Sequence, residues 1–252
     1  MCLQVPVCLL IRPLAGNIGH KFIRGITNFV YPDHWSRIPE LVEPRFNFTI
    51  GIHPHFAREQ GNRSFVSYLQ HPKCVAVGEI GFDYGFCRLC RGSSCCHLEN
   101  KRQSHENYLR SILPLADYFN KSLVVHCRDS GDGSALASML VLIQELRLTH
   151  VPIHLLCFTG RQEDVTTWSQ CPNVYFCISS LLCSDIQLRE AIRVMPISRL
   201  VIESDAPYLP RSVTTPWESC SFVLPVLSRI LCLPPEVILS CNALNLKALY
   251  KL

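Results

Sequence analysis

Polar residues able to bind a metal or a phosphate follow several short apolar runs of this sequence. They are His53, His55, Glu79, Asp83, His126, Arg128 and Asp205. Any one of them, taken singly, is more often a surface residue or a hydrogen-bonded cap than a ligand. Their recurrence after successive apolar runs favours a common site. Carboxylate oxygen and imidazole nitrogen suit divalent cations, so the pattern predicts a metal that activates water and holds a phosphoryl oxygen.

The elements that must position these residues are short buried strands. Continuous apolar runs occupy residues 23–30, 46–52, 74–80, 122–127, 151–158, 174–179 and 200–204. Such runs are typical of strands buried on both faces of a parallel sheet. Helical spacing at residues 108–116, 135–146 and 186–194 separates several of them, and residues 222–252 are expected to form closing helices. The alternation predicts a TIM-like (β/α) barrel, in which the carboxyl ends of the strands carry the reactive groups.

Composition sets the broader class. The 252 residues are 48% hydrophobic and 17% charged, enough to bury a large core and too apolar for disorder. The net charge of +4 is spread without a run and indicates no membrane partner. Several of the 15 cysteines, such as Cys127, Cys157 and Cys177, sit in apolar segments, which favours reduced thiols. We expect a monomeric protein of the cytosol or nucleus.

The motifs GIHPH, GEIGFDYG, VVHCRDS, CFTG and IESDAPYLP, in this order and with Asn245 ahead of Leu249, resemble the TatD family of metal-dependent deoxyribonucleases. GEIGFDY together with ESDAPYL is the most specific part, and the HPHFA segment is similar to the larger eukaryotic branch. The resemblance covers about residues 22–252. It implies an amidohydrolase-type TIM barrel of the metallo-dependent hydrolase class that hydrolyses phosphodiester bonds of DNA.

The resemblance also implies roles for matching residues. Glu79 corresponds to the glutamate that bridges two metals, His126 to a histidine ligand, and Asp205 to the aspartate that binds metal and positions the attacking water. Glu79 and Asp205 are thus the candidate catalytic residues. The implied cofactor is Mg²⁺, Mn²⁺ or Zn²⁺, with up to two ions. His53, His55 and Arg128 are candidate substrate-binding residues, since a guanidinium suits phosphate. A salt bridge to Asp129 or Asp83 is the alternative role for Arg128.

Two departures from the family pattern bear on activity. The family's histidine directly before CFTG is replaced by Leu156, which offers no lone pair to a metal. His154 lies two residues earlier and is expected on the same face but about 7 Å lower, given the strand rise. It would replace the lost ligand only after a register shift, so a polar residue lower in the barrel is the better interpretation.

The second departure is the family's first-strand His-x-His pair, since residues 1–22 contain only His20. Either the true start lies upstream, with residues 1–22 from an incorrect exon, or the strand has been lost or replaced. A strand at residues 5–11, with Cys8 facing inward, would fill the gap, but Pro6 argues against a central strand. Residues 1–22 are therefore an atypical N-terminal segment, and residues 23–252 form the barrel domain.

A cysteine-rich insertion at residues 86–99 has no counterpart in the family. Cys87, Cys90, Cys95, Cys96 and His97 have spacing that suits a closed zinc site. A flexible basic loop beside the mouth of the barrel is the alternative, given Arg88, Arg91 and Lys101.

Two functions follow from these residues. The first is a TatD-type hydrolase with DNA as substrate. The second is a catalytically impaired barrel that keeps the pocket and binds nucleic acid or a protein partner, because half of the family's ligands are missing.

Overall fold

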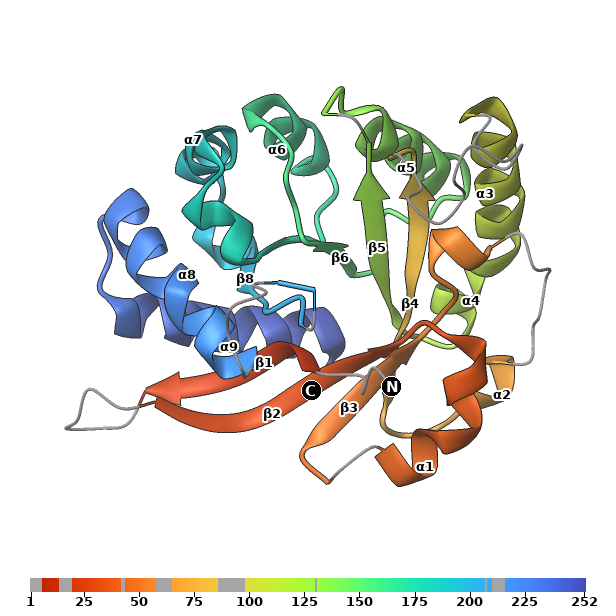
Figure 1. Ribbon diagram of the computed structural model, residues 1–252, viewed down its shortest axis with the longest axis horizontal. Coiled ribbons are helices and arrows are strands. Elements are labelled where there is room, and N and C mark those ends of the chain that lie inside the picture. Colours follow the sequence, from red (N-terminus) through yellow and green to blue (C-terminus); the bar gives the residue numbers. More distant parts are fainter. Residues whose placement is uncertain are drawn as a thin grey trace.

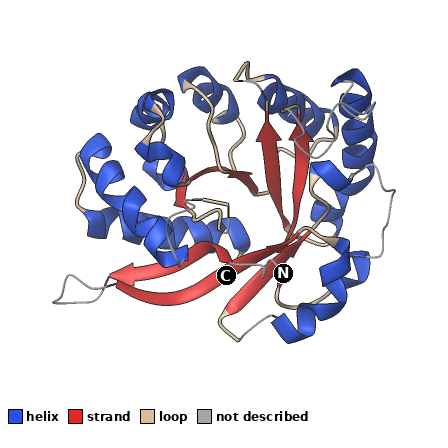
Figure 2. Cartoon of the chain, in the orientation of Figure 1, coloured by secondary structure: helices blue, strands red, loops and turns tan. Residues whose placement is uncertain are grey.

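A computed structural model describes residues 6–13, 20–41, 44–57, 65–85, 98–129, 131–206, 208–209 and 216–252. Its centre is one eight-stranded sheet whose strands are hydrogen-bonded in chain order, from β1 to β8. β2 to β8 are parallel and β1 runs antiparallel to β2. The sheet is curled, with helices along its outer side (Figure 1; Figure 2).

Each predicted apolar run overlaps one of the parallel strands, so the α/β fold expected from the sequence is confirmed. The strands are β2 (His20–Phe29), β3 (Phe46–Ile50), β4 (Cys74–Asp83), β5 (Ser122–Arg128), β6 (Ile153–Leu156), β7 (Val174–Ile178) and β8 (Leu200–Ile202). All ten residues of β4 and all four of β6 are buried, which explains why these runs do not alternate with polar residues.

Pro6 argued against a central strand at residues 5–11, and the structure has an edge strand there instead. β1 (Pro6–Pro13) is a strand, but it pairs only with β2 and stands at the edge of the sheet in the described part of the chain. Pro6 is its first residue. A proline is tolerated at the start of an edge strand, where no ladder hydrogen bond is lost. The curled sheet is thus open between β1 and β8 and resembles a half-barrel.

The helices follow the predicted segments, with one break. They are α1 (Ile38–Leu41), α2 (Val66–Leu69), α3 (Leu98–Ile112), α4 (Pro114–Tyr118), α5 (Ser134–Glu145), α6 (Gln162–Trp168), α7 (Ile186–Val194), α8 (Pro216–Leu231) and α9 (Pro235–Tyr250). Short 3-10 turns include η2 (Pro54–Phe56) and η6 (Ile197–Arg199). The segment predicted as helical at residues 108–116 is divided at Leu113, because Pro114 starts a new helix.

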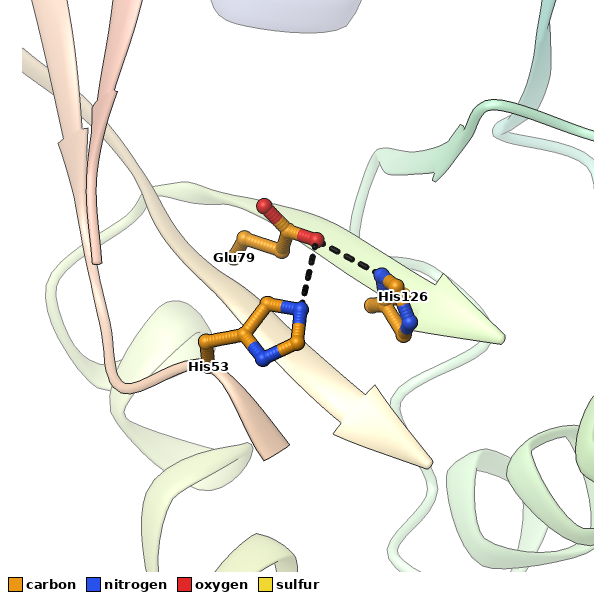
Figure 3. A group of neighbouring side chains, drawn as sticks. All are labelled: His53, Glu79 and His126. Atoms are coloured by element: carbon orange, nitrogen blue, oxygen red, sulfur yellow. Dashed lines mark hydrogen bonds and ion pairs between the residues drawn. The ribbon is translucent and has the colours of Figure 1, made fainter. Parts of the chain in front are cut away.

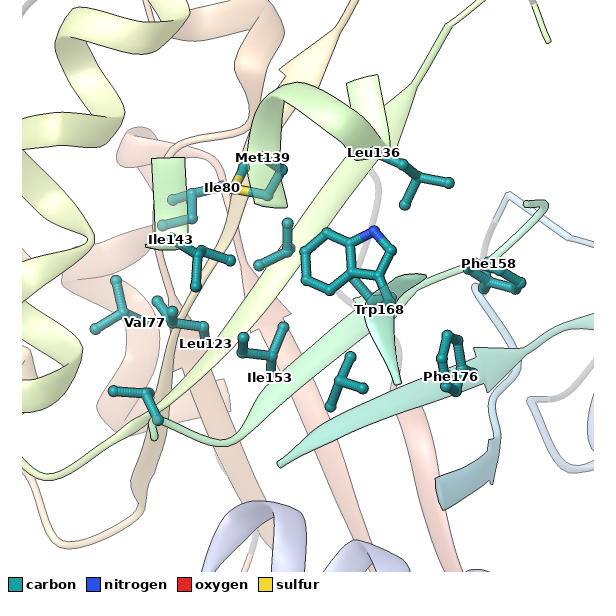
Figure 4. Close-up of a cluster of buried hydrophobic side chains, with 14 of the residues drawn as sticks. Val77, Ile80, Leu123, Leu136, Met139, Ile143, Ile153, Phe158, Trp168 and Phe176 are labelled. Atoms are coloured by element: carbon teal, nitrogen blue, oxygen red, sulfur yellow. The ribbon is translucent and has the colours of Figure 1, made fainter. Parts of the chain in front are cut away.

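The main core lies between the outer face of the sheet and the helices that cover it. Figure 4 shows Met139 and Ile143 of α5 and Trp168 of α6 packed over Leu123 and Ile153 of the strands. These side chains are at most 1% exposed. This close packing fixes the positions of the parallel strands and hence of the residues at their carboxyl ends.

α9 fills the inner side of the curled sheet. Leu246, Leu249 and Tyr250 pack against inward-facing residues of the strands, among them Val124 and Val201. The helix also contacts both β1 and β8, the two edges of the sheet.

The backbone of β8 on the side away from β7 is bonded by two asparagines of α9. Oδ1 of Asn242 accepts a hydrogen bond from the Ile202 N–H at 2.9 Å. Nδ2 of Asn245 donates to the carbonyl oxygens of Leu200 and Ile197 at 2.7 and 2.8 Å. These side chains satisfy the polar groups that a neighbouring strand would otherwise satisfy.

None of the described helices is by itself long and apolar enough to span a membrane; α8 and α9 reach that length and hydropathy only as a pair bent by 108°.

We expect Asn242→Ala to lower the free energy of unfolding by about 1–3 kcal/mol, because it leaves the buried Ile202 N–H without an acceptor. The matched control is Leu244→Ala on the exposed face of the same helix, where the side chain is 66% exposed and the expected change is under about 0.5 kcal/mol. Urea unfolding measures both variants. Equal midpoints would show that α9 does not secure the β8 edge in this way.

Candidate metal centre

Glu79 reaches the inner side of the sheet through an irregularity in β4. Gly78 pairs with Val124 and Ile80 with Val125, so Glu79 is one extra residue in the ladder. Such a bulge redirects a side chain. Gly78 permits it, since its φ is +145° and a Cβ there would lie 2.3 Å from the Val124 carbonyl oxygen. Val77 and Ile80 on either side both pack into the outer core.

Glu79 meets two histidines from neighbouring strands (Figure 3). Its Oε1 lies 2.7 Å from Nδ1 of His126 at the end of β5 and 3.7 Å from Nε2 of His53 after β3. The three residues each offer a ligand atom within 4.8 Å of the others. Carboxylate and imidazole side chains this close together make this place a candidate site for a divalent ion such as Zn²⁺ or Mn²⁺.

Asp83, at the end of β4, is buried beside the same cluster and contacts two of the histidines. Its Oδ2 lies 2.7 Å from Nε2 of His55 and 3.5 Å from Nε2 of His126, and the residue is 1% exposed. Its Oδ1 accepts a hydrogen bond from the Gly85 N–H at 2.9 Å. His126 therefore stands between two buried carboxylates.

These contacts shift the pKa values of the cluster. Burial alone would lower the pKa of His126, but Asp83 and Glu79 outweigh it and raise that pKa to about 9. Burial would raise the pKa of Glu79, yet His126 and His53 hold it below its usual value. The pKa of His53 falls to about 3, chiefly because the ring is buried.

His53 has its Nδ1 occupied. The backbone N–H of His55 donates to it at 3.2 Å, within the turn of η2. A neutral imidazole that accepts at Nδ1 carries its proton on Nε2, so this ring presents an N–H toward Glu79. In this tautomer Nε2 of His53 points an N–H at Glu79 from 3.7 Å and has no lone pair for a metal.

Asp205 follows β8, with a left-handed φ of 48° that aspartate tolerates. Burial, then Glu203 and Glu79, raise its pKa well above the usual value. Asp205 is close enough to Glu79 and His126 for both to affect this pKa electrostatically. A cation there would remove the repulsion between the carboxylates.

A divalent ion fits this donor set. Nδ1 of His126 faces Oε1 of Glu79 at 2.7 Å, while Nε2 lies 3.5 Å from Oδ2 of Asp83, so Nδ1 is the ring nitrogen that an ion held by Glu79 would reach once its proton is lost. Together with Glu79 and the crowded carboxyl of Asp205, it provides two oxygen donors and one nitrogen donor.

The structure places Leu156 and His154 as the sequence predicts. Leu156 pairs with His126 in the β5–β6 ladder, so it stands at the level of the cluster, and His154 pairs with Val124 below it. His154 is fully buried, with Nε2 2.9 Å from Oε2 of Glu203 and Nδ1 2.5 Å from the Tyr250 hydroxyl. Both ring nitrogens are satisfied there. His154, Cys177 and Glu203 also lie within metal-binding distance of one another.

Arg128 is exposed and lines a cavity of about 460 Å³ with Cys127, Thr159 and Arg161. Asp129 does not bind it. The carboxylate of Asp129 instead accepts hydrogen bonds from the N–H groups of Gly131 and Ala135 at the start of α5. Among the described residues the Arg128 guanidinium makes no ion pair, and its contact with phosphate stays a prediction.

The residues predicted to bind structural zinc, Cys87, Cys90, Cys95, Cys96 and His97, lie outside the described residues. The zinc site remains a prediction. Nine cysteines in the described part carry free thiols, and Cys74, Cys171, Cys177 and Cys220 among them are buried.

The model of one family, described as TatD-related DNase, matches residues 18–251. This chain belongs to that family. TatD proteins depend on metal ions, in agreement with the His and Glu groups found here.

Curated TatD relatives are nucleases. The chain is 34% identical over 185 residues to the human 3′-5′ RNA nuclease TATDN2, covering 71% of this chain but only 22% of that protein. It is 30% identical to the 3′-5′ ssDNA/RNA exonuclease TatD of Citrobacter koseri, covering 81% of this chain and 74% of the relative. The corresponding Escherichia coli enzyme is 28% identical, with 66% and 60% covered.

Solved structures show the same fold. A TatD-family hydrolase from Entamoeba histolytica matches with a TM-score of 0.69 at 17% identity, covering 89% of this chain and 83% of that one. An uncharacterized amidohydrolase from Saccharomyces cerevisiae matches with a TM-score of 0.60 at 14% identity, covering 89% and 88%.

Two features of this TatD centre escape prediction from sequence. The first is the hydrogen bond from the His55 N–H to Nδ1 of His53, which depends on the η2 turn. The proline in HPH does predict a turn there, but not this hydrogen bond. The pairing of Asp83 with both His55 and His126 depends on the bulge at Glu79. Gly78 and Gly81 around Glu79 were the available signal, since glycines inside a strand often mark a bulge.

The metal-free protein should lose stability as pH rises. The folded pKa of His126 is about 9 against an ordinary 6.5, so its stabilising effect is complete below pH 6.5 and lost as pH passes 9. Urea unfolding with EDTA, from pH 6.5 to 9, should show a falling free energy of unfolding. In His126→Gln the fall should be much smaller. A stability that is constant or rises in the unmutated protein would contradict the charge state assigned to His126.

Proposed function

We propose that this chain hydrolyses phosphodiester bonds of single-stranded nucleic acid with one divalent ion, held by Glu79, His126 and Asp205. The observation that carries the proposal is the convergence of Oε1 of Glu79 and Nδ1 of His126 at 2.7 Å, from two neighbouring strands. Asp205 lies close enough to Glu79 for that carboxylate to raise its pKa.

The substrate class is supported by the relatives. The human relative bears the name of an RNA nuclease and the bacterial relatives that of an ssDNA/RNA exonuclease, both 3′-5′. We infer the same polarity for this chain, with DNA or RNA as substrate. The predicted DNA substrate is thereby widened to both nucleic acids.

A divalent ion at this site would lower the pKa of bound water and neutralise charge on a phosphate oxygen. The chain's own residues supply the remaining steps. Asp205, beside the ion, would accept a proton from the attacking water. His53 donates its Nε2–H to a phosphate oxygen, and the Arg128 guanidinium binds the phosphate through its paired N–H groups. His55, held by Asp83, borders the same mouth.

Leu156 favours one ion over two. It stands in register with His126, where the family has a ligand, and its side chain is apolar and 6% exposed.

The same residue supports a second candidate function. A barrel that retains the mouth but holds its ion weakly would bind nucleic acid without cutting it.

Cleavage of a 3′-labelled single-stranded oligonucleotide separates the two functions. We expect slow, Mn²⁺-stimulated cleavage that EDTA abolishes and that Glu79→Gln reduces at least about 100-fold in kcat/KM, because the ion loses its central ligand. Leu156→His should raise the rate about tenfold or more by adding a nitrogen ligand at the level of His126.

The matched control is Leu155→His on the opposite face of β6, which changes the same strand without facing the cluster. Circular dichroism identifies variants that fail to fold. If neither the unmutated protein nor Leu156→His cuts in a metal-dependent manner, the hydrolase proposal is wrong and the binding function stands.

A further inference from the structure

An aromatic group borders the candidate metal centre, on loops that follow three strands. It consists of Tyr31 after β2, His34 in the next turn, Phe56 after β3 and Tyr208 after β8. We call these four residues the aromatic rim. Tyr208 is 52% exposed, and Tyr31, His34 and Phe56 are partly buried. An aromatic ring left half in solvent beside a polar cluster is available to a ligand.

The rim is held by its own contacts. The ring of Tyr31 packs edge-on against Phe56, with centroids 5.4 Å apart, and against His34 at 5.6 Å. The hydroxyls of Tyr31 and Tyr208 lie 2.5 Å apart and join the loop after β2 to the loop after β8. These are the two parallel strands nearest the open side of the sheet. The rim is therefore ordered before any ligand binds.

Tight turns connect the rim to the site residues. The Phe56 N–H donates to the His53 carbonyl oxygen at 2.8 Å, and the Tyr208 N–H donates to the Asp205 carbonyl oxygen at 2.9 Å. A ring on each turn thus keeps a fixed position relative to His53 or Asp205. A ligand whose phosphate lies at the metal centre brings its adjoining groups to the rim.

The chemistry of the rim suits a nucleobase. An aromatic face stacks on any base, because every base has a π-face, and such stacking contributes affinity without sequence preference. The rim contains no carboxylate or ammonium that would select a charged group. A base must leave the stack of its neighbours to reach Tyr208, which a single strand permits at lower cost than a duplex.

We propose that Tyr208, supported by Tyr31 and Phe56, stacks on the unpaired base next to the phosphate that is cut. This inference rests on the proposed nuclease function and assigns the residues that select single strands.

The test is equilibrium binding of a fluorescein-labelled oligodeoxythymidylate, measured by anisotropy. Every protein carries Glu79→Gln, so that the probe is not cut, and Mn²⁺ is present. Tyr208→Ala should weaken binding by about 5-fold to 150-fold, the range expected for loss of one stacked base. Tyr208→Phe should bind within about 2-fold of the background protein, because it keeps the ring.

Tyr118→Ala is the matched control. This tyrosine is 81% exposed on α4, which precedes β5 and so lies toward the opposite end of the strands from the metal centre. We expect no change in affinity. An abasic 3′-terminal nucleotide in the probe should weaken its binding to the background protein. The same change should weaken binding to Tyr208→Ala very little, because the ring that stacks on the missing base is already absent.

The outcomes separate the two proposals. If the background protein binds the probe and Tyr208→Ala binds equally well, the stacking role is wrong while the nuclease function is untouched. If Tyr208→Ala and Tyr208→Phe weaken binding equally, the hydroxyl rather than the ring is responsible, which also overturns the inference. If the Glu79→Gln background binds no single strand, the unmutated protein is measured in Mn²⁺ with a phosphorothioate probe that resists cleavage, and failure to bind there contradicts the nuclease function itself.

Discussion

The contact between Glu79 and His126 is the interaction on which the rest of the site depends. It joins β4 to β5 at 2.7 Å in a nearly solvent-free position. A buried carboxylate is unfavourable without a partner, and a buried imidazolium equally so. Asp83 gives His126 a second carboxylate, His53 directs an N–H toward Glu79, and Asp205 adds a carboxyl whose pKa is raised. The charges of these residues partly neutralise one another, and a bound cation would neutralise the remaining carboxylate charge.

The open side of the sheet shapes the mouth above this contact. β1 runs antiparallel along β2, and Asn242 and Asn245 of α9 bind the backbone of β8. The Tyr31–Tyr208 hydrogen bond then joins the loops after β2 and β8. At this edge the strands are therefore stabilised by side chains of α9 and by a pair of tyrosines. The other parallel strands are stabilised by backbone hydrogen bonds to a neighbouring strand.

Much of this architecture is predictable from sequence, because it follows from burial. Seven apolar runs predict seven parallel strands, and the polar residues after them predict which side chains share a mouth. Leu156 and His154 lie at the expected levels, since side-chain direction in a strand repeats every two residues. What depends on backbone irregularity escapes prediction. The bulge at Glu79 and the antiparallel pairing of β1 are set by tertiary contacts, and Pro6 argued against a strand that an edge position tolerates.

The most direct test of the account is the number of metal ions bound. Native mass spectrometry with Mn²⁺ or Zn²⁺, supported by titration calorimetry, should find one ion per chain at this centre. Glu79→Gln and His126→Gln should each remove it, and His154→Gln should leave it in place, with circular dichroism checking the fold of each. Any zinc held by the Cys87 segment would survive Glu79→Gln and is counted separately. An ion that survives both Glu79→Gln and His126→Gln but is lost in His154→Gln would place the metal lower in the barrel and contradict the assignment.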